Sequence, residues 1–215
     1  MEITNVGRQL LLFGHVLIFA FAIVTVLRED FALFRARRIE PVALEATGRT
    51  MSWLLALLWI SGGSLILLDS GMDLALLATK SKLATKLTVV SLLTVNGLLL
   101  HWVAFPMMTR PQRLPGLAAG VCATLGAISS VTWVHASFVG VARLIAPSLS
   151  YAGFMDLYLA ALAIGVATAL IVVRPRIAAM LTRADDAGAS PATADGYGSS
   201  NPFDLHEGPA TAAQG

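Results

Sequence analysis

Five long apolar runs constrain this chain more than any other feature of its sequence. A helix needs about 20 mostly apolar residues to cross about 30 Å of hydrocarbon, and each run is close to that length or longer. Backbone groups left unpaired in lipid are costly, so such runs are expected to be helices. The sequence therefore predicts an all-α bundle of five transmembrane helices, over residues 10–27, 51–68, 87–105, 114–141 and 151–173.

The composition favours lipid over water as the surroundings of these runs. Of the 215 residues, 56% are hydrophobic and only 13% are charged, whereas an average soluble domain has about 25% charged residues. A chain this short cannot hide so much apolar surface in one aqueous core. The net charge is only +2, and no clustered basic face of the kind that binds nucleic acid is present. The single cysteine, Cys122, excludes a disulfide framework.

The basic residues predict the orientation of the bundle, because Lys and Arg favour the cytoplasmic loops of membrane proteins. If five helices alternate in direction, ten of the fifteen Lys and Arg residues fall at one end. Those ten are Arg28, Arg35, Arg37, Arg38, Arg49, Arg110, Arg113, Arg174, Arg176 and Arg183. The other five are Arg8, Lys80, Lys82, Lys86 and Arg143. The excess predicts that the N-terminus lies outside the cell membrane and the C-terminus in the cytoplasm.

The chain after the fifth run has a different composition. Residues 184–215 are rich in Ala, Gly, Ser, Asp and Pro and contain no Lys or Arg. A segment of this kind has too little apolar surface to offset the entropy of ordering it. We expect residues 1–183 to form the helical domain and residues 184–215 to form a disordered cytoplasmic tail.

Ionisable side chains inside the runs mark candidate sites, because charge is costly in lipid. His15 and His135 belong to different helices, and both lie within about 10 Å of the predicted outer surface at 1.5 Å of rise per residue. Imidazole nitrogens bind copper, zinc and haem iron, so the pair is a candidate site for a metal ion or a b-type haem. The alternative is that each imidazole hydrogen-bonds a group on a neighbouring helix.

Three further ionisable positions belong to the third and fifth runs. Lys86, Thr94 and His101 fall on one stripe of the third helix, at about 100° per residue. Lys86 can also extend its ammonium group to the outer headgroups. Asp156 lies near the outer end of the fifth helix, where a carboxylate can pair with a basic side chain or interact with the helix N-terminus. Asn96 lies off the stripe, so an interhelical hydrogen bond is expected there.

The segment 77–101, with the sequence LATKSKLATKLTVVSLLTVNGLLLH, resembles the copper-resistance D type of bacterial membrane module. In that family a short turn precedes a helix with an internal Lys and a later Asn, which match Lys86 and Asn96 here. Gly14 and His15 at the start of the first run fit the same layout. The resemblance covers about the first three runs, and this chain has fewer spans than the full family. It implies copper handling or a related role at the periplasmic face. The chain also resembles small uncharacterised bacterial inner-membrane proteins. With the short, compact loops, these resemblances imply a bacterial inner membrane, in which the N-terminus would be periplasmic and the C-terminus cytoplasmic.

Three functions remain open from the sequence. The first is a membrane protein that binds copper or haem b through His15 and His135. The second is a small transporter or channel, in which the stripe of Lys86, Thr94 and His101 lines a path. The third is a non-catalytic accessory or assembly protein that binds partner membrane proteins as well as the lipid bilayer. Enzymatic activity has the least support, since the sequence contains no phosphate-binding loop, no HExxH motif and no paired carboxylates within the runs.

Overall fold

The computed structural model describes residues 3–36, 38–70, 81–142 and 149–189, and the regular secondary structure in these ranges is entirely helical. The elements are α1 (Ile3–Arg35), α2 (Pro41–Ser70), α4 (Ser81–Leu99), η1 (Leu100–Ala104), α5 (Phe105–Thr109), α6 (Pro115–Val141), α7 (Tyr151–Thr168), η2 (Ala169–Val173) and α8 (Arg174–Ala189). Two of them, η1 and η2, are π-helical segments that continue α4 into α5 and α7 into α8.

The prediction of an all-α fold with five long apolar helices is confirmed. By length and composition, five helical stretches could cross a membrane: Asn5–Arg35, Pro41–Asp69, Ser81–Thr109, Pro115–Val141 and Tyr151–Arg183. Four of these contain a predicted run whole. The fourth begins one residue later than expected, because Leu114 has a non-helical backbone and Pro115 takes the first helical position, which suits the fixed φ angle of proline.

Helix α8 extends six residues past residue 183, the predicted end of the helical domain. Helix α8 continues to Ala189, so the backbone of 184–189 is helical. Five of these six residues are Ala or Asp, and three of them are Ala, which has the highest helix propensity of all residues. The low apolar content of this segment therefore did not prevent one more turn and a half of helix. The predicted tail from residue 190 onward lies outside the described residues.

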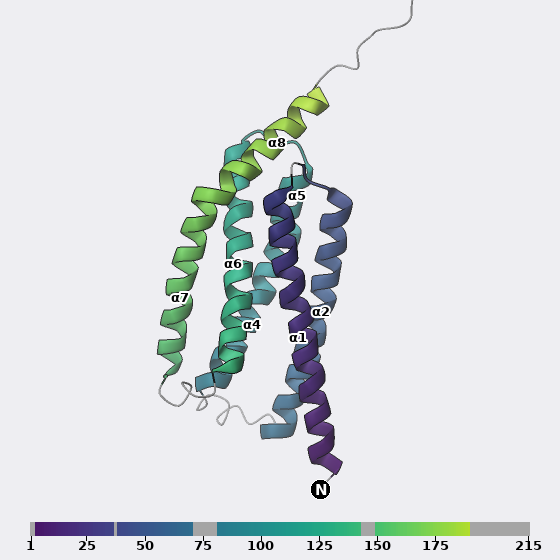
Figure 1. Cartoon of the computed structure of the whole chain (residues 1–215), viewed down its shortest axis with the longest axis vertical. Coiled ribbons are helices and arrows are strands. Elements are labelled where there is room, and N and C mark those ends of the chain that lie inside the picture. Colours follow the sequence, from purple (N-terminus) through teal and green to yellow (C-terminus); the bar gives the residue numbers. More distant parts are fainter. Residues whose placement is uncertain (1–2, 37, 71–80, 143–148, 190–215) are drawn as a thin grey trace, which may run out of the picture.

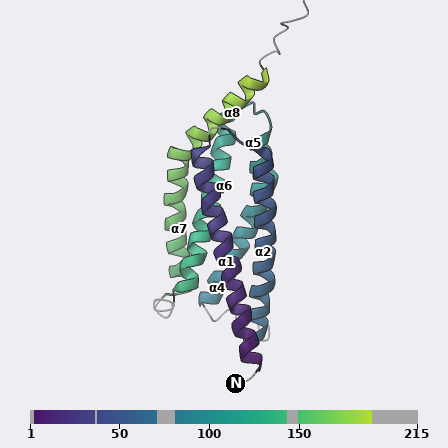
Figure 2. The same ribbon diagram turned by 45° about the vertical axis from the view of Figure 1, so that its right-hand side comes forward.

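The helices alternate in direction and lie side by side. In Figures 1 and 2, α7 and α2 lie at opposite edges of the bundle, with α6, α4 and α1 between them. The N-terminal end of α1 lies at the lower end in both views, and α5 and α8 lie at the upper end. At the lower end, Arg8 on α1 binds Asp69 on α2 through two hydrogen bonds of 2.6 and 3.1 Å, which fixes the register of this helix pair.

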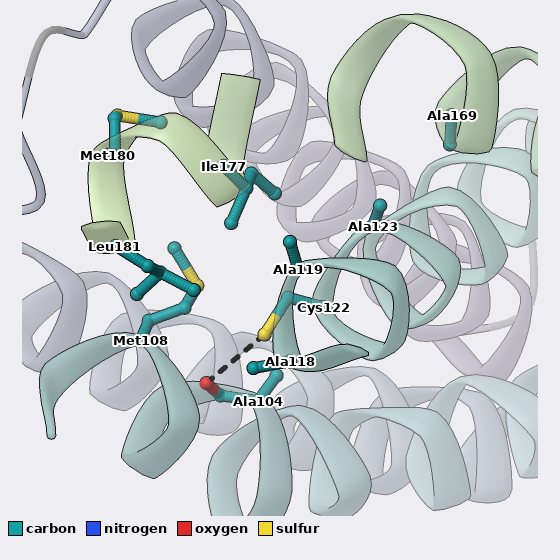
Figure 3. Packing of buried hydrophobic residues seen from close by; sticks show 10 residues of the cluster. All are labelled: Ala104, Met108, Ala118, Ala119, Cys122, Ala123, Ala169, Ile177, Met180 and Leu181. Atoms are coloured by element: carbon teal, nitrogen blue, oxygen red, sulfur yellow. Dashed lines mark hydrogen bonds between the residues drawn. The ribbon is translucent and has the colours of Figure 1, made fainter. Parts of the chain in front are cut away.

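Helix α6 is the central element, and the largest core cluster forms around its upper half. Ala118, Ala119, Cys122 and Ala123 on α6 contact buried residues of η1, α5, η2 and α8. Figure 3 shows that the thiol of Cys122 points toward Ala104 of η1, where its sulfur lies 3.6 Å from the carbonyl oxygen. Small residues on α6 allow this close packing of helices. The other members of the cluster are Ala104, Met108, Ala169, Ile177, Met180 and Leu181.

A second cluster joins the α1–α2 hairpin to the rest of the bundle. Trp133 of α6 is 3% exposed, and its ring lies 5.6 Å from that of Phe19 on α1. The buried members around it are Ala22, Val26, Leu58 and Leu93. These residues come from α1, α2 and α4, so one indole connects three neighbouring helices.

The π-helical segments shift the buried face of their helices by one residue. A π-turn closes its hydrogen bond five residues along the chain, one more than an α-turn. On α4 the buried positions are Thr85, Val89, Leu93 and Asn96, and an uninterrupted α-helix would next bury residues 103 and 107 on this face. The structure instead buries Ala104 and Met108. The extra residue in η1 therefore decides which side chains of α5 face α6.

Candidate functional site

A groove lies between the first half of α2 and the η1–α5 segment, at the upper end of the bundle. Its cavity volume is about 690 Å³, which lies within the usual range of ligand pockets, about 300–1,000 Å³. We call it the α2–α5 groove. Its lining residues are Leu44, Glu45, Arg49, Ser52, Trp53, His101, Phe105, Pro106, Thr109 and Arg110.

The spacing along the two walls explains how this groove forms. On α2 the lining positions are two adjacent residues, then one residue four positions later, then two adjacent residues three positions after that, so they share one face of the helix. The facing wall follows the same spacing from His101 to Arg110, after the one-residue shift in η1. At 1.5 Å per residue, Glu45 and Trp53 are separated by about 12 Å along α2, so the groove runs parallel to the bundle axis.

Gly48 allows the two walls to meet at one point. A Cβ atom at this position would lie 2.6 Å from the Cε2 atom of Phe105, closer than two carbon atoms can approach. The ring of Phe105 in turn lies 6.0 Å from the ring of His101, edge to face. His101 therefore lies beside the point where α2 meets α5, on the groove wall.

Four ionisable side chains line the groove, namely Glu45, Arg49, His101 and Arg110. The salt bridges within the described part of the chain are Arg8–Asp69, Arg28–Glu29 and Arg38–Glu40, so none involves a groove residue. The guanidinium groups of Arg49 and Arg110 thus form no salt bridge with a described residue. A guanidinium group presents five N–H donors in a planar fork that matches carboxylate and phosphate oxygens.

His15 contacts α2. Its Nδ1 lies 2.7 Å from the hydroxyl oxygen of Ser61. That hydroxyl donates its hydrogen to the carbonyl of Leu57 at 2.7 Å, so Nδ1 of His15 is the donor to Ser61. A Cβ atom on Gly62 would lie 3.4 Å from the Cε1 atom of the same imidazole, an ordinary van der Waals contact, so the ring of His15 lies directly against α2. His15 therefore makes the interhelical hydrogen bond that was the alternative to a ligand role.

His135 lies in a different environment, between α6 and α7. It is 5% exposed, and its ring lies 5.2 Å from that of Tyr158 and 6.0 Å from that of Phe138. The Tyr158 hydroxyl lies 3.0 Å from that of Thr132. The Nε2 atom of His135 is buried without a hydrogen-bond partner in the described part of the protein. The two histidines thus contact different helices, and no contact in the described ranges joins their imidazoles.

The predicted stripe on the third helix does not face the bundle centre. The buried face of α4 consists of Thr85, Val89, Leu93 and Asn96, whereas Lys86 is exposed. Thr94 accepts a hydrogen bond of 2.9 Å from the indole of Trp59 on α2. The stripe thus lies toward α2, and His101 at its upper end lines the α2–α5 groove.

Two expectations about polar contacts have different outcomes. The interhelical hydrogen bond of Asn96 is confirmed, since its amide nitrogen donates to the carbonyl of Leu125 on α6 at 3.1 Å. Asp156 is exposed on α7 and forms no salt bridge with any described residue. The N-cap of this helix is Ser150, whose hydroxyl accepts from the backbone N–H of Gly153 at 3.1 Å. The cap that Asp156 could have supplied is therefore provided one turn and a half earlier.

Reasoning from the sequence missed Glu45, Arg49 and Arg110 as site residues. It used both arginines only to orient the bundle. The available signal was that Arg49 and Arg110 flank the second and third runs at the same end, with Trp53 one turn away from Arg49. Among the described residues, no group of three or more His, Cys, Asp or Glu side chains could hold a metal ion.

Comparisons with known proteins add no assignment to this geometry. No protein-family model, no curated protein and no solved structure matches the chain. The resemblance to copper-resistance D modules therefore stays a prediction, and the α2–α5 groove is the feature on which a functional proposal can be built.

Proposed function

We propose that this chain is an integral protein of a bacterial inner membrane that binds an amphipathic small molecule in the α2–α5 groove. The observation that carries the proposal is the groove itself. Charged side chains without salt bridges line the same cavity as the apolar side chains of Leu44, Trp53 and Phe105. A ligand with a charged end and an apolar end would satisfy both parts of such a wall.

The distribution of apolar side chains supports a lipid environment. Phe21, Ile60 and Ile164 are each at least two-thirds exposed, and many other large apolar side chains along the five helices are exposed. Soluble monomers rarely expose contiguous apolar surface on this scale. In a bilayer the same side chains would contact acyl chains.

The basic residues support the proposed orientation. Arg35, Arg110 and Arg174 lie at the upper end, together with the groove, because the helices alternate in direction. Cytoplasmic loops carry the excess of Lys and Arg in membrane proteins. The N-terminus would then be periplasmic and the groove would open near the cytoplasmic surface.

Filling the groove with a large side chain tests the proposal. We expect Ser52→Trp to reduce severalfold the amphipathic molecules that co-purify with the protein, because an indole at this position occupies the cavity. The measurement is mass spectrometry of organic extracts from protein purified in mild detergent. The matched control is Thr50→Trp, an exposed position on the same helix outside the groove. Equal amounts of co-purifying molecules in both variants and the unaltered protein would contradict the proposal.

A metal ion or b-type haem bound through His15 and His135 is a second candidate, favoured by one observation. The Nε2 atom of His135 is buried and has no hydrogen-bond partner in the described ranges, and a buried polar atom without a partner is costly. The candidate predicts stoichiometric copper or a Soret band in the purified protein, lost in both His15→Ala and His135→Ala. Metal analysis and a visible spectrum of these three samples test it, and an unchanged signal in His135→Ala contradicts it.

The hypotheses of a transporter or channel and of an accessory or assembly protein have less support. A path along α4 would need the stripe of Lys86, Thr94 and His101 to line the interior, but that stripe lies away from the buried face. A role as an accessory protein would use the exposed apolar faces to bind partner membrane proteins. Lipid alone accounts for those faces, so they do not favour a protein partner.

A further inference from the structure

We propose that the α2–α5 groove binds a phosphate-bearing anionic headgroup, and that the ligand is an anionic phospholipid of the surrounding membrane. The proposal rests on the function proposed above and names the class of ligand. It assigns the phosphate oxygens to Arg49 and Arg110 and the first part of the acyl chains to the wall around Trp53.

The charge of the groove selects an anion. Two arginines face one carboxylate, that of Glu45, and His101 adds a third nitrogen-bearing side chain. Neither arginine forms a salt bridge with a described residue. Charge-assisted hydrogen bonds from guanidinium to phosphate are about twice as strong as neutral ones. A phosphate group can accept from both guanidinium groups because it presents several oxygens.

The polarity of the groove changes along its length, as a lipid headgroup site requires. Glu45 and Arg110 lie near the upper end, where α2 begins and α5 ends. Trp53 and His101 lie deeper, with Trp53 about 12 Å below Glu45 along α2. Tryptophan is enriched at the level of lipid headgroups because its ring is apolar and its N–H is polar. A headgroup at the arginines would thus place its acyl chains beside the indole.

The volume of the groove fits part of a lipid rather than a whole one. A cavity of about 690 Å³ accommodates a headgroup and the first methylene groups of the acyl chains. The rest of each chain would leave through the open side and lie against the exposed apolar surface of the bundle. A free phosphate ion would fill only a small fraction of the same volume and would leave the wall around Trp53 without contacts.

The test measures binding of phosphatidylglycerol to the full-length protein in mild detergent. Native mass spectrometry gives the apparent affinity for phosphatidylglycerol and, separately, for uncharged diacylglycerol. We expect Arg49→Gln combined with Arg110→Gln to weaken the binding of phosphatidylglycerol at least tenfold, an order-of-magnitude expectation for two lost charge-assisted bonds. The binding of diacylglycerol should not change.

The matched control is Arg38→Gln combined with Arg113→Gln. This variant has the same net charge, and its substitutions lie at the same end of the bundle but outside the groove. We expect it to bind phosphatidylglycerol like the unaltered protein. An equal loss of affinity for phosphatidylglycerol in both double variants would show that the effect comes from general surface charge, and it would overturn the proposal.

Two further measurements separate the sources of phosphate and the two proposals. If inorganic phosphate at millimolar concentration displaces phosphatidylglycerol, the lipid assignment is overturned in favour of a soluble phosphate. If it does not, the lipid assignment stands. If diacylglycerol and phosphatidylglycerol bind equally, and Ser52→Trp blocks both, the groove binds amphipathic molecules but the headgroup inference fails. If Ser52→Trp affects neither, both proposals fail together.

Discussion

Replacing Trp133 by alanine is expected to cause the largest loss of stability of any single substitution considered for this protein. The indole is 3% exposed and connects α6 to α1, α2 and α4. Truncating a buried tryptophan to alanine typically costs about 3–5 kcal/mol. For a chain of this length, that loss corresponds to a Tm lower by roughly 10 °C. The α1–α2 hairpin should separate from the other helices first, because this cluster provides its buried connection to them.

The single cysteine provides a direct measurement of this effect. Cys122 is 5% exposed and lies in a different core cluster from Trp133, so a fluorogenic thiol reagent should react with it only on unfolding. The matched control is Trp102→Ala, because that indole is 68% exposed and its removal leaves no cavity. A Tm for Trp133→Ala within a degree or two of that of Trp102→Ala would show that the cluster does not hold the hairpin in place.

Thiol labelling of intact spheroplasts is expected to give an all-or-none result that defines the orientation. In a Gly7→Cys variant the new thiol lies on an exposed position near the start of α1, where a Cβ atom meets no neighbour within 4 Å. With a periplasmic N-terminus, a membrane-impermeant maleimide should label it in spheroplasts. A thiol at exposed Pro111, in the Pro111→Cys variant, should be labelled only after the inner membrane is opened.

The unaltered protein is the control for both variants, since its buried Cys122 should stay unlabelled until detergent denatures the chain. Labelling of Pro111→Cys but not Gly7→Cys in intact spheroplasts would reverse the orientation and place the α2–α5 groove at the periplasmic face. Labelling of both positions from outside would show that the first three helices do not place residues 7 and 111 on opposite sides of the membrane.

The five helices could be predicted from the sequence because their signal is local. Each apolar run is long, and Asp156 is the one Asp, Glu, Lys or Arg within the five runs. No arrangement of the rest of the chain changes the length of a run. The ends of the helices were less predictable. Helix α2 begins at Pro41, ten residues before the run at residue 51, since polar residues such as Glu45 and Arg49 form a helix as readily as apolar ones.

The candidate site was only partly predictable, because depth follows from chain length whereas lateral position depends on packing. His15 and His135 were placed at a common depth, but their partners are Ser61 on α2 and Tyr158 on α7. His101 was identified as a polar stripe residue, but its place in a groove depends on how α2 meets α5. Those helices approach at Gly48 and Phe105, which are far apart in the sequence.

The π-helical segment η1 also escaped prediction, because a regular period of 3.6 residues was assumed throughout the third run. Its extra residue leaves the apolar character of the run unchanged. The extra residue is visible only in the structure, where the buried face shifts between Asn96 before the segment and Ala104 and Met108 at its end and beyond it. The same shift occurs on the fifth helix, where Tyr158 is buried below η2 and Ile177 above it.

The extra residue in η1 determines whether a protein related to this chain has the α2–α5 groove. A relative that lacked one residue within 100–104 would keep a third helix of the same apolar character. In an alignment, the missing residue would look like an ordinary one-residue gap. Everything beyond the gap would nevertheless be turned by about 100° around the helix axis. Phe105, Thr109 and Arg110 would then no longer face α2. A single-residue indel in the middle of an apolar run would therefore separate relatives that have the groove from relatives that have only the bundle.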